Sequence, residues 1–293
     1  MANVFATGAT GSIGTAVLRA LVARGHNVTA LTRSQSARQK VASAGACPYA
    51  GDLRAPDDWA RKAVTHDAIV HLASTLDDDM ADADDRTVAA LLDAAKRVTH
   101  RPRLIYTGGC WLYGATGEIV ADEEHPFDPL PAFAWMTRNA KRLLATAAFS
   151  TAVIHPAIVY HEAGGAFDSF IRAARQKQAI EIWGHGDTRW PLIHRRDLAD
   201  IYCTMVQRPD LIGHFNAVAE EGVRVRLIAD HIAEHFGTSK PHRILASDVL
   251  IAEHGDWALG PTLDQQMSGD KLRRLLGWTP AIPDFRKADL LSN

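Results

Sequence analysis

The sequence has few cysteines, no excess of charge of either sign and no long apolar run. Its three cysteines, Cys47, Cys110 and Cys203, are odd in number and far apart, which excludes a disulfide framework and offers no paired zinc-ligand spacing. Because 32 Lys+Arg balance 34 Asp+Glu, giving a formal net charge of -2, neither nucleic acid nor an anionic membrane is an expected partner. No stretch approaches the roughly 18 apolar residues that a membrane span needs.

The first residues also lack the features of a secretion signal. Residues 1–6 contain neither a cationic segment nor an apolar segment of signal length, and they lead directly into a predicted strand. We therefore expect a cytoplasmic protein. Its composition, 47% hydrophobic and 23% charged over 293 residues, is that of a globular chain with a sizeable core.

Short apolar runs alternate with segments of helical periodicity in the first half of the chain. We predict strands over residues 3–7, 27–31, 48–53, 68–72, 103–107 and 151–155. Helices are predicted over residues 15–24, 87–97 and 138–148, with a further polar helix after the second strand. Apolar strands that alternate with helices of about ten residues predict an α/β fold, a Rossmann-type doubly wound parallel sheet with helices on both faces.

Beyond about residue 160 this alternation weakens. Helices are predicted over residues 167–177 and 227–236, and the loops around residues 182–190 are rich in Gly, His and Trp. We assign residues 1–160 to the Rossmann domain, with a late strand near 213–219 returning to it. Residues 161–293 are assigned mainly to a smaller C-terminal mixed α/β lobe.

A glycine-rich turn, Thr7-Gly8-Ala9-Thr10-Gly11-Ser12-Ile13-Gly14, joins the first strand to the first helix. Glycines let the backbone turn tightly and approach a pyrophosphate, and the free amides at the helix N-terminus donate hydrogen bonds to it. Strand, glycines, helix and second strand follow one another within about 30 residues, as this motif requires. The pattern therefore predicts a dinucleotide-binding site.

The end of the second strand indicates which dinucleotide binds. An acid about 20 residues past the glycines would bind the ribose hydroxyl of NAD, but this chain reads Leu31-Thr32-Arg33 there. A guanidinium pairs with the 2′-phosphate of NADP, so we predict NADP(H) in preference to NAD(H). The alternative for Arg33 is a solvated cation at a helix start. Asp52, at the tip of the third strand, is predicted either to accept from the adenine amino group or to serve as a turn carboxylate.

With these motifs the sequence resembles the extended short-chain dehydrogenase/reductase family, the group of nucleotide-sugar epimerases and dehydratases. The family's Thr-Gly-x-x-Gly-x-Ile-Gly turn is complete here, and its Asp-Leu and His-x-Ala motifs are similar to Asp52-Leu53 and His71-Leu72-Ala73. Residues 190–199 and 276–280 resemble its later motifs. The resemblance spans nearly the whole chain and implies a Rossmann domain with a C-terminal substrate lobe.

The resemblance also implies site residues and a small-molecule substrate. Cofactor contacts are expected from Gly8, Thr10, Gly11, Ser12, Ile13, Gly14, Arg33, Asp52, Leu53, Leu72, Ala73, Thr107, Pro156 and Ile158. Substrate contacts are expected from Cys110, Trp111, Arg189 and His194. Relatives often dimerise through helices like those predicted over residues 87–97 and 138–148, which implies a homodimer.

The catalytic residues of the family are missing from their positions. Family members use a Tyr that transfers a proton, a Lys four residues later that lowers the pKa of that Tyr, and a Ser or Thr that orients the substrate oxygen. The corresponding positions read Phe133, Thr137 and Gly109. No Tyr-x-x-x-Lys occurs anywhere in the sequence, so the absence does not depend on the alignment.

Hydride transfer itself belongs to the nicotinamide, so the missing part is a proton donor. We predict Tyr113 and His155 as the first candidates, followed by Cys110, His194 and Tyr160. Each also has a structural interpretation, as a packed aromatic ring, a satisfied histidine or a small buried thiol.

Two charged or histidine-containing clusters favour structural interpretations. The carboxylates between Asp77 and Asp85 predict a solvated loop and a helix N-terminus rather than a metal site. His231 and His235 lie at i and i+4 beside Glu234 but lack a third spaced ligand. No metal site is therefore predicted.

The combined pattern predicts an NADP(H)-binding oxidoreductase that transfers hydride to a small organic acceptor without the usual Tyr-x-x-x-Lys. Its proton would come from water or from a non-standard donor. The alternative is a non-catalytic NADP(H)-binding redox sensor. A nucleotide-sugar epimerase or dehydratase ranks third, because both reactions begin with oxidation of a hydroxyl that the missing Tyr would deprotonate.

Overall fold

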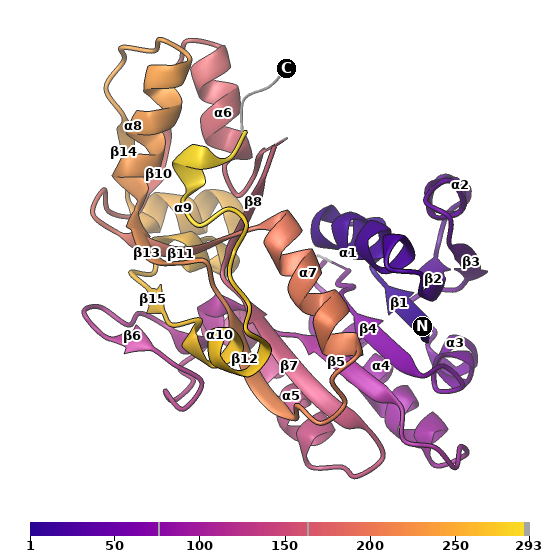
Figure 1. Ribbon diagram of the computed structural model, residues 1–293. Helices are drawn as coiled ribbons and strands as arrows, with labels where there is room; N and C mark the ends of the chain where they lie inside the picture. Colours follow the sequence, from indigo (N-terminus) through magenta and orange to yellow (C-terminus); the bar gives the residue numbers. More distant parts are fainter. Residues whose placement is uncertain (76, 163, 290–293) are drawn as a thin grey trace. The chain divides into compact units, whose positions relative to one another are not determined.

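The computed structural model describes residues 1–75, 77–162 and 164–289. Its elements, labelled in Figure 1, fall into two compact units. Unit 1 comprises Met1–Gly108, Trp135–Ile154 and Leu198–Phe215, and unit 2 comprises Gly109–Ala134, His155–Asp197 and Asn216–Asn293. The chain passes repeatedly from one unit to the other. This division differs from the predicted one, in which residues 1–160 and a late strand near 213–219 form one domain and most of residues 161–293 form the other.

A seven-stranded sheet organises unit 1. Its strands are β1 (Asn3–Thr7), β2 (Asn27–Thr32), β3 (Cys47–Ala50), β4 (Ala68–His71), β5 (Arg103–Thr107), β7 (Ser150–Pro156) and β12 (Gly213–Ala217). The order across the sheet is β12-β7-β5-β4-β1-β2-β3, and the β1–β2, β1–β4, β2–β3, β4–β5 and β5–β7 pairs are parallel. The strand order reverses between β1 and β4. In open α/β sheets, ligands bind at the carboxyl ends of the strands beside such a reversal.

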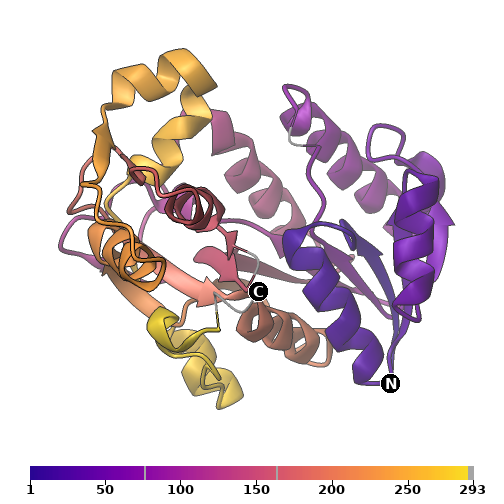
Figure 2. The same cartoon turned by 90° about the horizontal axis from the view of Figure 1, so that it is seen from above.

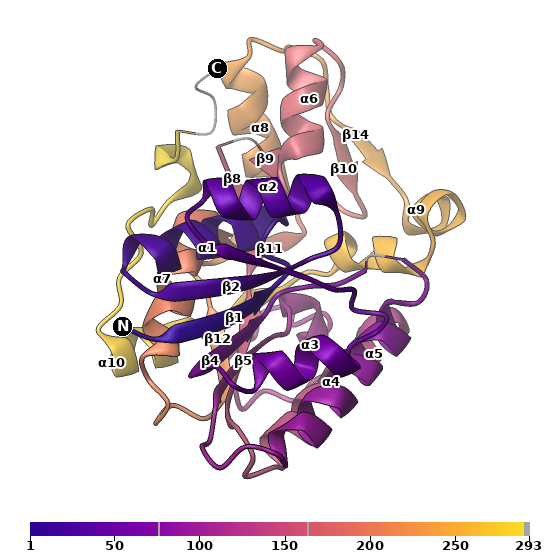
Figure 3. The same ribbon diagram turned by 90° about the vertical axis from the view of Figure 1, so that its right-hand side faces the viewer.

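Helices cover both faces of this sheet, as Figure 3 shows. One face carries α1 (Ser12–Ala23) and α2 (Gln35–Ser43), and the other carries α3 (Asp57–Ala63), α4 (Met80–Ala95) and α5 (Ala134–Leu144). On the second face the ring of Phe5 stacks on that of Trp59 at a centroid distance of 6.0 Å, within a core that includes Val88 and Leu91. A further helix, α7 (Arg195–Val206), is tied to α1 by the Arg24–Asp200 ion pair at 2.8 Å.

Unit 2 is a mixed α/β unit about as long as unit 1, rather than the smaller lobe that the sequence predicted. Its four-stranded sheet has the order β13-β11-β8-β9, formed by β8 (Ile158–His161), β9 (Gly164–Gly165), β11 (Arg189–His194) and β13 (Glu220–Arg224). The β8–β11 pair is parallel, whereas β8–β9 and β11–β13 are antiparallel. The helices α6 (Asp168–Arg175) and α8 (Val225–His235) lie side by side in both Figure 1 and Figure 2, and they share a core with Tyr160 and Trp190.

Short elements complete unit 2. They are the strand pairs β6 (Val120–Ala121) with β15 (Gln266–Met267) and β10 (Glu181–Trp183) with β14 (Arg243–Leu245), the helices α9 (Ser247–His254) and α10 (Asp270–Leu276), and the 3-10 helices η1 (Cys110–Tyr113), η2 (Pro131–Phe133), η3 (Asp256–Thr262) and η4 (Phe285–Lys287).

The α/β fold with a large parallel sheet confirms the predicted fold class. The six predicted strands all form, and a late strand, β12, lies at the edge of the same sheet. Several predicted boundaries were wrong, most of all the start of α4, which begins at Met80 rather than Thr87 because the acidic stretch before Thr87 joins the helix. The helix predicted to end at Ala148 ends at Leu144. Among the described residues, no helix combines the length and apolar character needed to cross a bilayer.

Candidate functional site

The glycine-rich turn closes tightly on itself at the carboxyl end of β1. Gly8 has a φ of +70°, which glycine adopts without strain, and Gly11 N donates to Gly8 O at 3.0 Å. A Cβ on Gly14 would lie 1.9 Å from Gly8 O, so the start of α1 packs directly on the turn. Gly11 caps α1 without a side chain, and the first helical turn holds no acid. The positive end of the helix dipole is therefore left for an anionic ligand.

A pocket of about 220 Å³ lies beside this turn, wholly within unit 1. It forms where the turn meets the end of β2 and the segments that follow β3 and β4. The lining residues are Gly8, Thr10, Leu31, Thr32, Arg33, Ser34, Ala37, Gly51, Asp52, Leu53, Ala73, Ser74 and Thr75. The fold thus gathers Gly8, Thr10, Arg33, Asp52, Leu53 and Ala73, which were predicted from separate parts of the sequence to contact a dinucleotide.

The other predicted cofactor residues do not line this pocket. Thr107 ends β5, where its hydroxyl donates to His71 O at 2.7 Å and lies 2.7 Å from the Tyr202 hydroxyl. The remaining positions are Gly11, Ser12, Ile13 and Gly14 in the turn and the start of α1, Leu72 after β4, and Pro156 and Ile158 in unit 2.

The two charged residues of the pocket have different surroundings. Arg33 is exposed between β2 and α2, and within the described chain no side chain pairs with its guanidinium. Asp52 Oδ1 accepts from the backbone nitrogen of Arg54 at 2.9 Å, which is the turn contact expected as the alternative role of Asp52. Arg33 is therefore the pocket's available cation, whereas one oxygen of Asp52 is already engaged.

The acidic segment after β4 is only partly solvated. The Arg54 guanidinium lies 2.6 Å from both Asp77 and Asp79, and this contact lowers the pKa of Asp79. Asp78 and Asp82 are exposed, as predicted for a solvated run. The prediction was wrong for Asp84, which is 7% exposed because α4 turns it toward the sheet.

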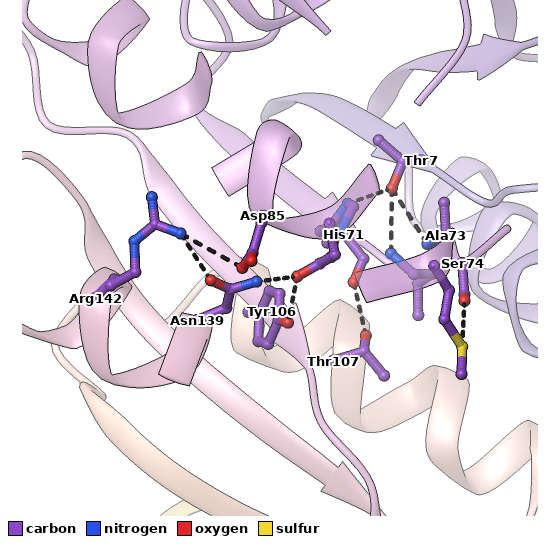
Figure 4. Close-up of polar contacts among 12 residues, drawn as sticks. Thr7, His71, Ala73, Ser74, Asp85, Tyr106, Thr107, Asn139 and Arg142 are labelled. Carbon is purple, nitrogen blue, oxygen red and sulfur yellow. Dashed lines mark hydrogen bonds and ion pairs between the residues drawn. The ribbon is translucent and has the colours of Figure 1, made fainter. Parts of the chain in front are cut away.

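Asp84 belongs to a buried polar network that connects β1, β4 and β5 to α4 and α5. Figure 4 labels the other four members, Thr7, His71, Tyr106 and Asn139. Thr7 Oγ1 lies 2.8 Å from His71 Nδ1, and His71 Nε2 lies 2.8 Å from Asp84 Oδ1. Asp84 Oδ2 accepts from the Tyr106 hydroxyl at 2.7 Å and from Asn139 Nδ2 at 2.8 Å. None of these side chains is more than 7% exposed. Burial, together with the adjacent carboxylate, raises the pKa of Tyr106.

Sequence reasoning missed Asp84, although a signal was present. Asp84 shares the helical spacing of Thr87, Val88 and Leu91, which are all buried on the same face of α4. Residues at positions i, i+3, i+4 and i+7 lie on one face of a helix. When the other residues of that face are buried, a carboxylate at position i is buried with them and needs hydrogen-bond donors in the core. Asn139, one of those donors, carried no comparable signal.

The predicted proton donors Tyr113 and His155 lie inside an aromatic cluster of unit 2. Tyr113 is 1% exposed, and its hydroxyl donates to Asn216 Oδ1 at 2.8 Å. His155 is fully buried, with ring centroids 5.8 Å from Tyr113 and 5.3 Å from Phe127. Burial raises the pKa of Tyr113 well above its ordinary value, so the phenol keeps its proton at neutral pH. Proton transfer by either residue stays a prediction.

The predicted substrate residues Cys110 and Trp111 are also packed into unit 2. Burial raises the pKa of the Cys110 thiol to about 12. The Trp111 ring lies 5.3 Å from that of Phe133, and a Cβ on Gly260 would lie 2.5 Å from the indole. By contrast, a Cβ on Gly109 would meet no atom within 4 Å, so this position has room for a side chain. Of the three positions that the resemblance assigns to the family's catalytic residues, Gly109 and Phe133 lie in unit 2 and Thr137 lies in unit 1.

Arg189, predicted to contact substrate, is held by two carboxylates. Its Nε and one terminal nitrogen donate to Asp264 at 3.0 and 2.7 Å, and its terminal nitrogens donate to Glu118 at 3.2 and 3.0 Å. The Arg189 side chain is 16% exposed. An anionic substrate group would therefore have to displace a carboxylate before it could pair with this guanidinium.

His194, the other predicted substrate residue in β11, is 1% exposed. Its Nδ1 accepts from the backbone nitrogen of Arg196 at 3.2 Å, and Nε2 lies 3.7 Å from a carboxylate oxygen of Glu162. Burial lowers the pKa of His194, so the ring is neutral at pH 7 and carries its proton on Nε2.

The histidines of α8 are packed against rings. The His231 ring lies edge-on to Phe285 at 5.5 Å, and the His235 ring lies 5.0 Å from Phe236. In the part of the chain that the structure describes, no three His, Cys, Asp or Glu side chains are grouped so as to hold a metal ion.

A second pocket, of about 550 Å³ and entirely in unit 2, contains a carboxyl group with an altered pKa. Glu220, in β13, accepts from the backbone nitrogen of Phe285 at 2.8 Å. Burial raises the pKa of this carboxyl group to about 7. Its charge state therefore changes near neutral pH.

Comparisons with known proteins find a matching family model and related proteins. The model of the family described as "NAD dependent epimerase/dehydratase family" matches residues 4–218. The chain is 28% identical over 285 residues to "Uncharacterized protein C2A9.02" of Schizosaccharomyces pombe, covering 95% of each protein. It is 26% identical over 315 residues to "3-diazoavenalumate denitrifying reductase" of a Streptomyces species, covering 97% of this chain and 98% of that one.

The fold is shared with a solved human protein. The structure of human epimerase family protein SDR39U1 (isoform2) with NADPH superposes with a TM-score of 0.80 at 21% identity, covering 98% of each chain. At this level of identity the likeness concerns the fold.

We predict that Gly14→Ala abolishes the anion-binding turn. The added methyl group would lie 1.9 Å from Gly8 O, so α1 must move away from the turn. We expect a loss of about 1–3 kcal/mol of stability in urea unfolding and at least a roughly tenfold weaker binding of dinucleotide in a fluorescence titration. Gly109→Ala, where the added atom meets nothing within 4 Å, is the control for stability. Equal unfolding midpoints for the two variants would contradict the close packing of the turn.

We predict that Glu220→Gln stabilises the protein at pH 8 more than at pH 5. The pKa of about 7 in the folded state exceeds the ordinary value of 4.5, so the penalty of the ionised carboxyl is complete above pH 7 and absent below pH 4.5. Gln keeps an acceptor for Phe285 N. After discounting for solvent screening, we expect a gain of about 1 kcal/mol at pH 8 in urea unfolding. The exposed neighbour Glu221→Gln serves as control, and a pH-independent effect at Glu220 would refute the shift.

Proposed function

This chain belongs to the NAD-dependent epimerase/dehydratase family, and on that premise we propose that unit 1 binds NADP(H) and that the protein is a reductase. In this proposal hydride passes to a small organic acceptor without a Tyr-x-x-x-Lys pair. The observation that carries the proposal is the unpaired Arg33 in the pocket beside the glycine turn. The relatedness to a reductase and the likeness to a structure with NADPH support it.

The residues of the unit 1 pocket fit this dinucleotide. The close approach of Gly8 and Gly14 leaves backbone amides, rather than side chains, facing the pyrophosphate at the start of α1. Arg33 would pair with the 2′-phosphate, and no acid stands at the end of β2 to repel it. Asp52 and Leu53 would contact the adenine, with the second oxygen of Asp52 accepting from its amino group.

The proposed reaction consumes one hydride and one proton per acceptor. NADPH, when bound, supplies the hydride. The Tyr113 phenol and the Cys110 thiol both hold their protons more tightly than in water, because burial raises the pKa of each. His194 is neutral at pH 7 and therefore a weak acid. We propose that solvent water delivers the proton.

A second candidate is a non-catalytic NADP(H)-binding redox sensor. Burial of Tyr113, His155 and Cys110 favours it, because a protein without an accessible acid can still bind the dinucleotide. Such a sensor needs different affinities for NADPH and NADP⁺, together with a conformational change on binding. A nucleotide-sugar epimerase is less favoured, because Arg189 is already paired and no Tyr-x-x-x-Lys is present.

We predict that Arg33→Ala weakens NADPH binding by roughly ten- to a hundredfold, the loss of one charge-assisted contact to a phosphate. NADH binding should stay unchanged, because NADH has no 2′-phosphate. The measurement is a fluorescence titration of each protein with NADPH and NADH in parallel. Arg61→Ala, an exposed cation on α3 outside the pocket lining, is the control. A wild-type preference for NADH would overturn the assignment of NADP(H).

We predict that the protein oxidises NADPH when supplied with a carbonyl, quinone or enone acceptor, followed as loss of NADPH absorbance. Because water supplies the proton in this proposal, Tyr113→Phe should keep most of the turnover. Binding of NADPH without oxidation by any acceptor, with unequal affinities for NADPH and NADP⁺, would favour the sensor instead. Turnover of a nucleotide sugar would overturn both.

A further inference from the structure

The last residues of β1 and β4, Thr7 and His71, are register partners in the sheet. Each is followed at once by residues of the dinucleotide pocket or its border: Gly8 follows Thr7, and Leu72 and Ala73 follow His71. Thr7 Oγ1 lies 2.8 Å from His71 Nδ1 and 3.3 Å from the backbone nitrogens of both Leu72 and Ala73. Figure 4 shows the hydrogen bonds by which the Thr7 hydroxyl joins the two segments.

The direction of these hydrogen bonds follows from the donors around Asp84. The Tyr106 hydroxyl and the Asn139 amide nitrogen both donate to the buried carboxylate. The carboxylate has only acceptors to offer, so His71 Nε2, at 2.8 Å from Oδ1, carries a proton. Asp84 thereby fixes the orientation of the imidazole ring.

A proton on Nε2 leaves Nδ1 of His71 free to accept from the Thr7 hydroxyl. The lone pairs of Thr7 Oγ1 then accept the N–H groups of Leu72 and Ala73. A proton on Nδ1 as well would direct three donors at the two lone pairs of Thr7, so the singly protonated ring fits better. The bonds form one directed chain, from the two amides through Thr7 and His71 to Asp84.

This chain of bonds reaches the glycine turn through direct contact. A Cβ on Gly8 would lie 2.7 Å from Ala73 N and 2.8 Å from the carbonyl carbon of Leu72, so Gly8 rests against this backbone. Gly8 O in turn accepts from Gly11 N at the start of α1. A displacement of the Leu72–Ala73 peptide would therefore move the amides that face an anionic ligand.

We propose that His71 is a positioning residue of the dinucleotide site and that Asp84 fixes the orientation of its ring. His71 orients the Thr7 hydroxyl, which holds the Leu72 and Ala73 amides and, through them, Gly8. Neither side chain lines the pocket, so both act through other groups. The inference rests on the proposed binding of NADP(H) to unit 1 and adds the side chains that maintain the shape of that site.

Two substitutions of His71 separate its hydrogen bond with Thr7 from its hydrogen bond with Asp84. His71→Asn places an amide at the position of Nδ1 and keeps an acceptor for Thr7. His71→Gln places the amide at the position of Nε2 and keeps a donor to Asp84 instead. Tyr106→Phe is the matched control, because it removes one donor from the same carboxylate without touching Thr7.

We expect the dissociation constant for NADPH to rise roughly tenfold or more in His71→Gln, and less than about threefold in His71→Asn and Tyr106→Phe. Urea unfolding, measured in parallel, reports the loss of stability that the three variants share. Without cofactor, the amides of Leu72 and Ala73 should exchange hydrogen faster in His71→Gln than in His71→Asn.

Equal affinity losses in the two His71 variants, or losses that follow the unfolding midpoints across all three proteins, would overturn the positioning role. If the wild-type protein binds NADPH tightly in that same experiment, the proposed function still stands. If the wild-type protein binds neither dinucleotide, the proposed function and this inference both fail. Unchanged amide exchange in His71→Gln would also count against the inference, independently of any ligand.

Discussion

The buried carboxylate of Asp84 is the constraint on which the carboxyl edge of the central sheet depends. An ionised carboxylate removed from water costs several kcal/mol unless donors surround it. Its donors come from β4, β5 and α5, in the form of His71, Tyr106 and Asn139. β4, β5 and α5 must therefore be packed in one particular arrangement around α4 before all three donors can reach the Asp84 carboxylate. The network makes the arrangement of this edge specific, and the glycine turn is built on the same edge through Thr7.

The sequence predicted the fold correctly wherever a pattern within a few neighbouring residues determines the local structure. Strands such as residues 103–107 are apolar runs of strand length, and the glycines before α1 admit only a tight turn. The gathering of Arg33 and Asp52 in one pocket also followed, because consecutive parallel strands end at one edge of the sheet. The start of α4 did not follow, because a run of carboxylates resembles a solvated loop until one of them, Asp84, is recognised as part of a buried stripe.

Hydrogen bonds and ion pairs between residues far apart in the sequence could not be predicted, because no local sequence pattern specifies which residues pair. Arg189 and Asp264 are 75 positions apart in sequence, and Asp84 and Asn139 are 55 apart. The consequence for Arg189 is chemical. A guanidinium that donates to two carboxylates presents little positive potential to a ligand, whereas the unpaired Arg33 presents all of its charge. Unit 1 thus offers a cation for an anionic ligand, and unit 2 neutralises the cation expected to face the substrate.

The raised pKa of the Cys110 thiol in unit 2 bears on which hydride acceptors suit the proposed reductase. Hydride addition to a simple ketone produces an alkoxide, a strong base that needs an acid at hand. Hydride addition to a quinone produces an anion of phenolic character, whose conjugate acid has a pKa of about 10. Because burial raises the pKa of the Cys110 thiol to about 12, that thiol would be a poor acid even for such an anion. Acceptors whose reduced anions are weakly basic therefore need no acid beside them during hydride transfer, because such an anion is stable until bulk solvent protonates it. The absence of a Tyr-x-x-x-Lys sequence costs least with these substrates.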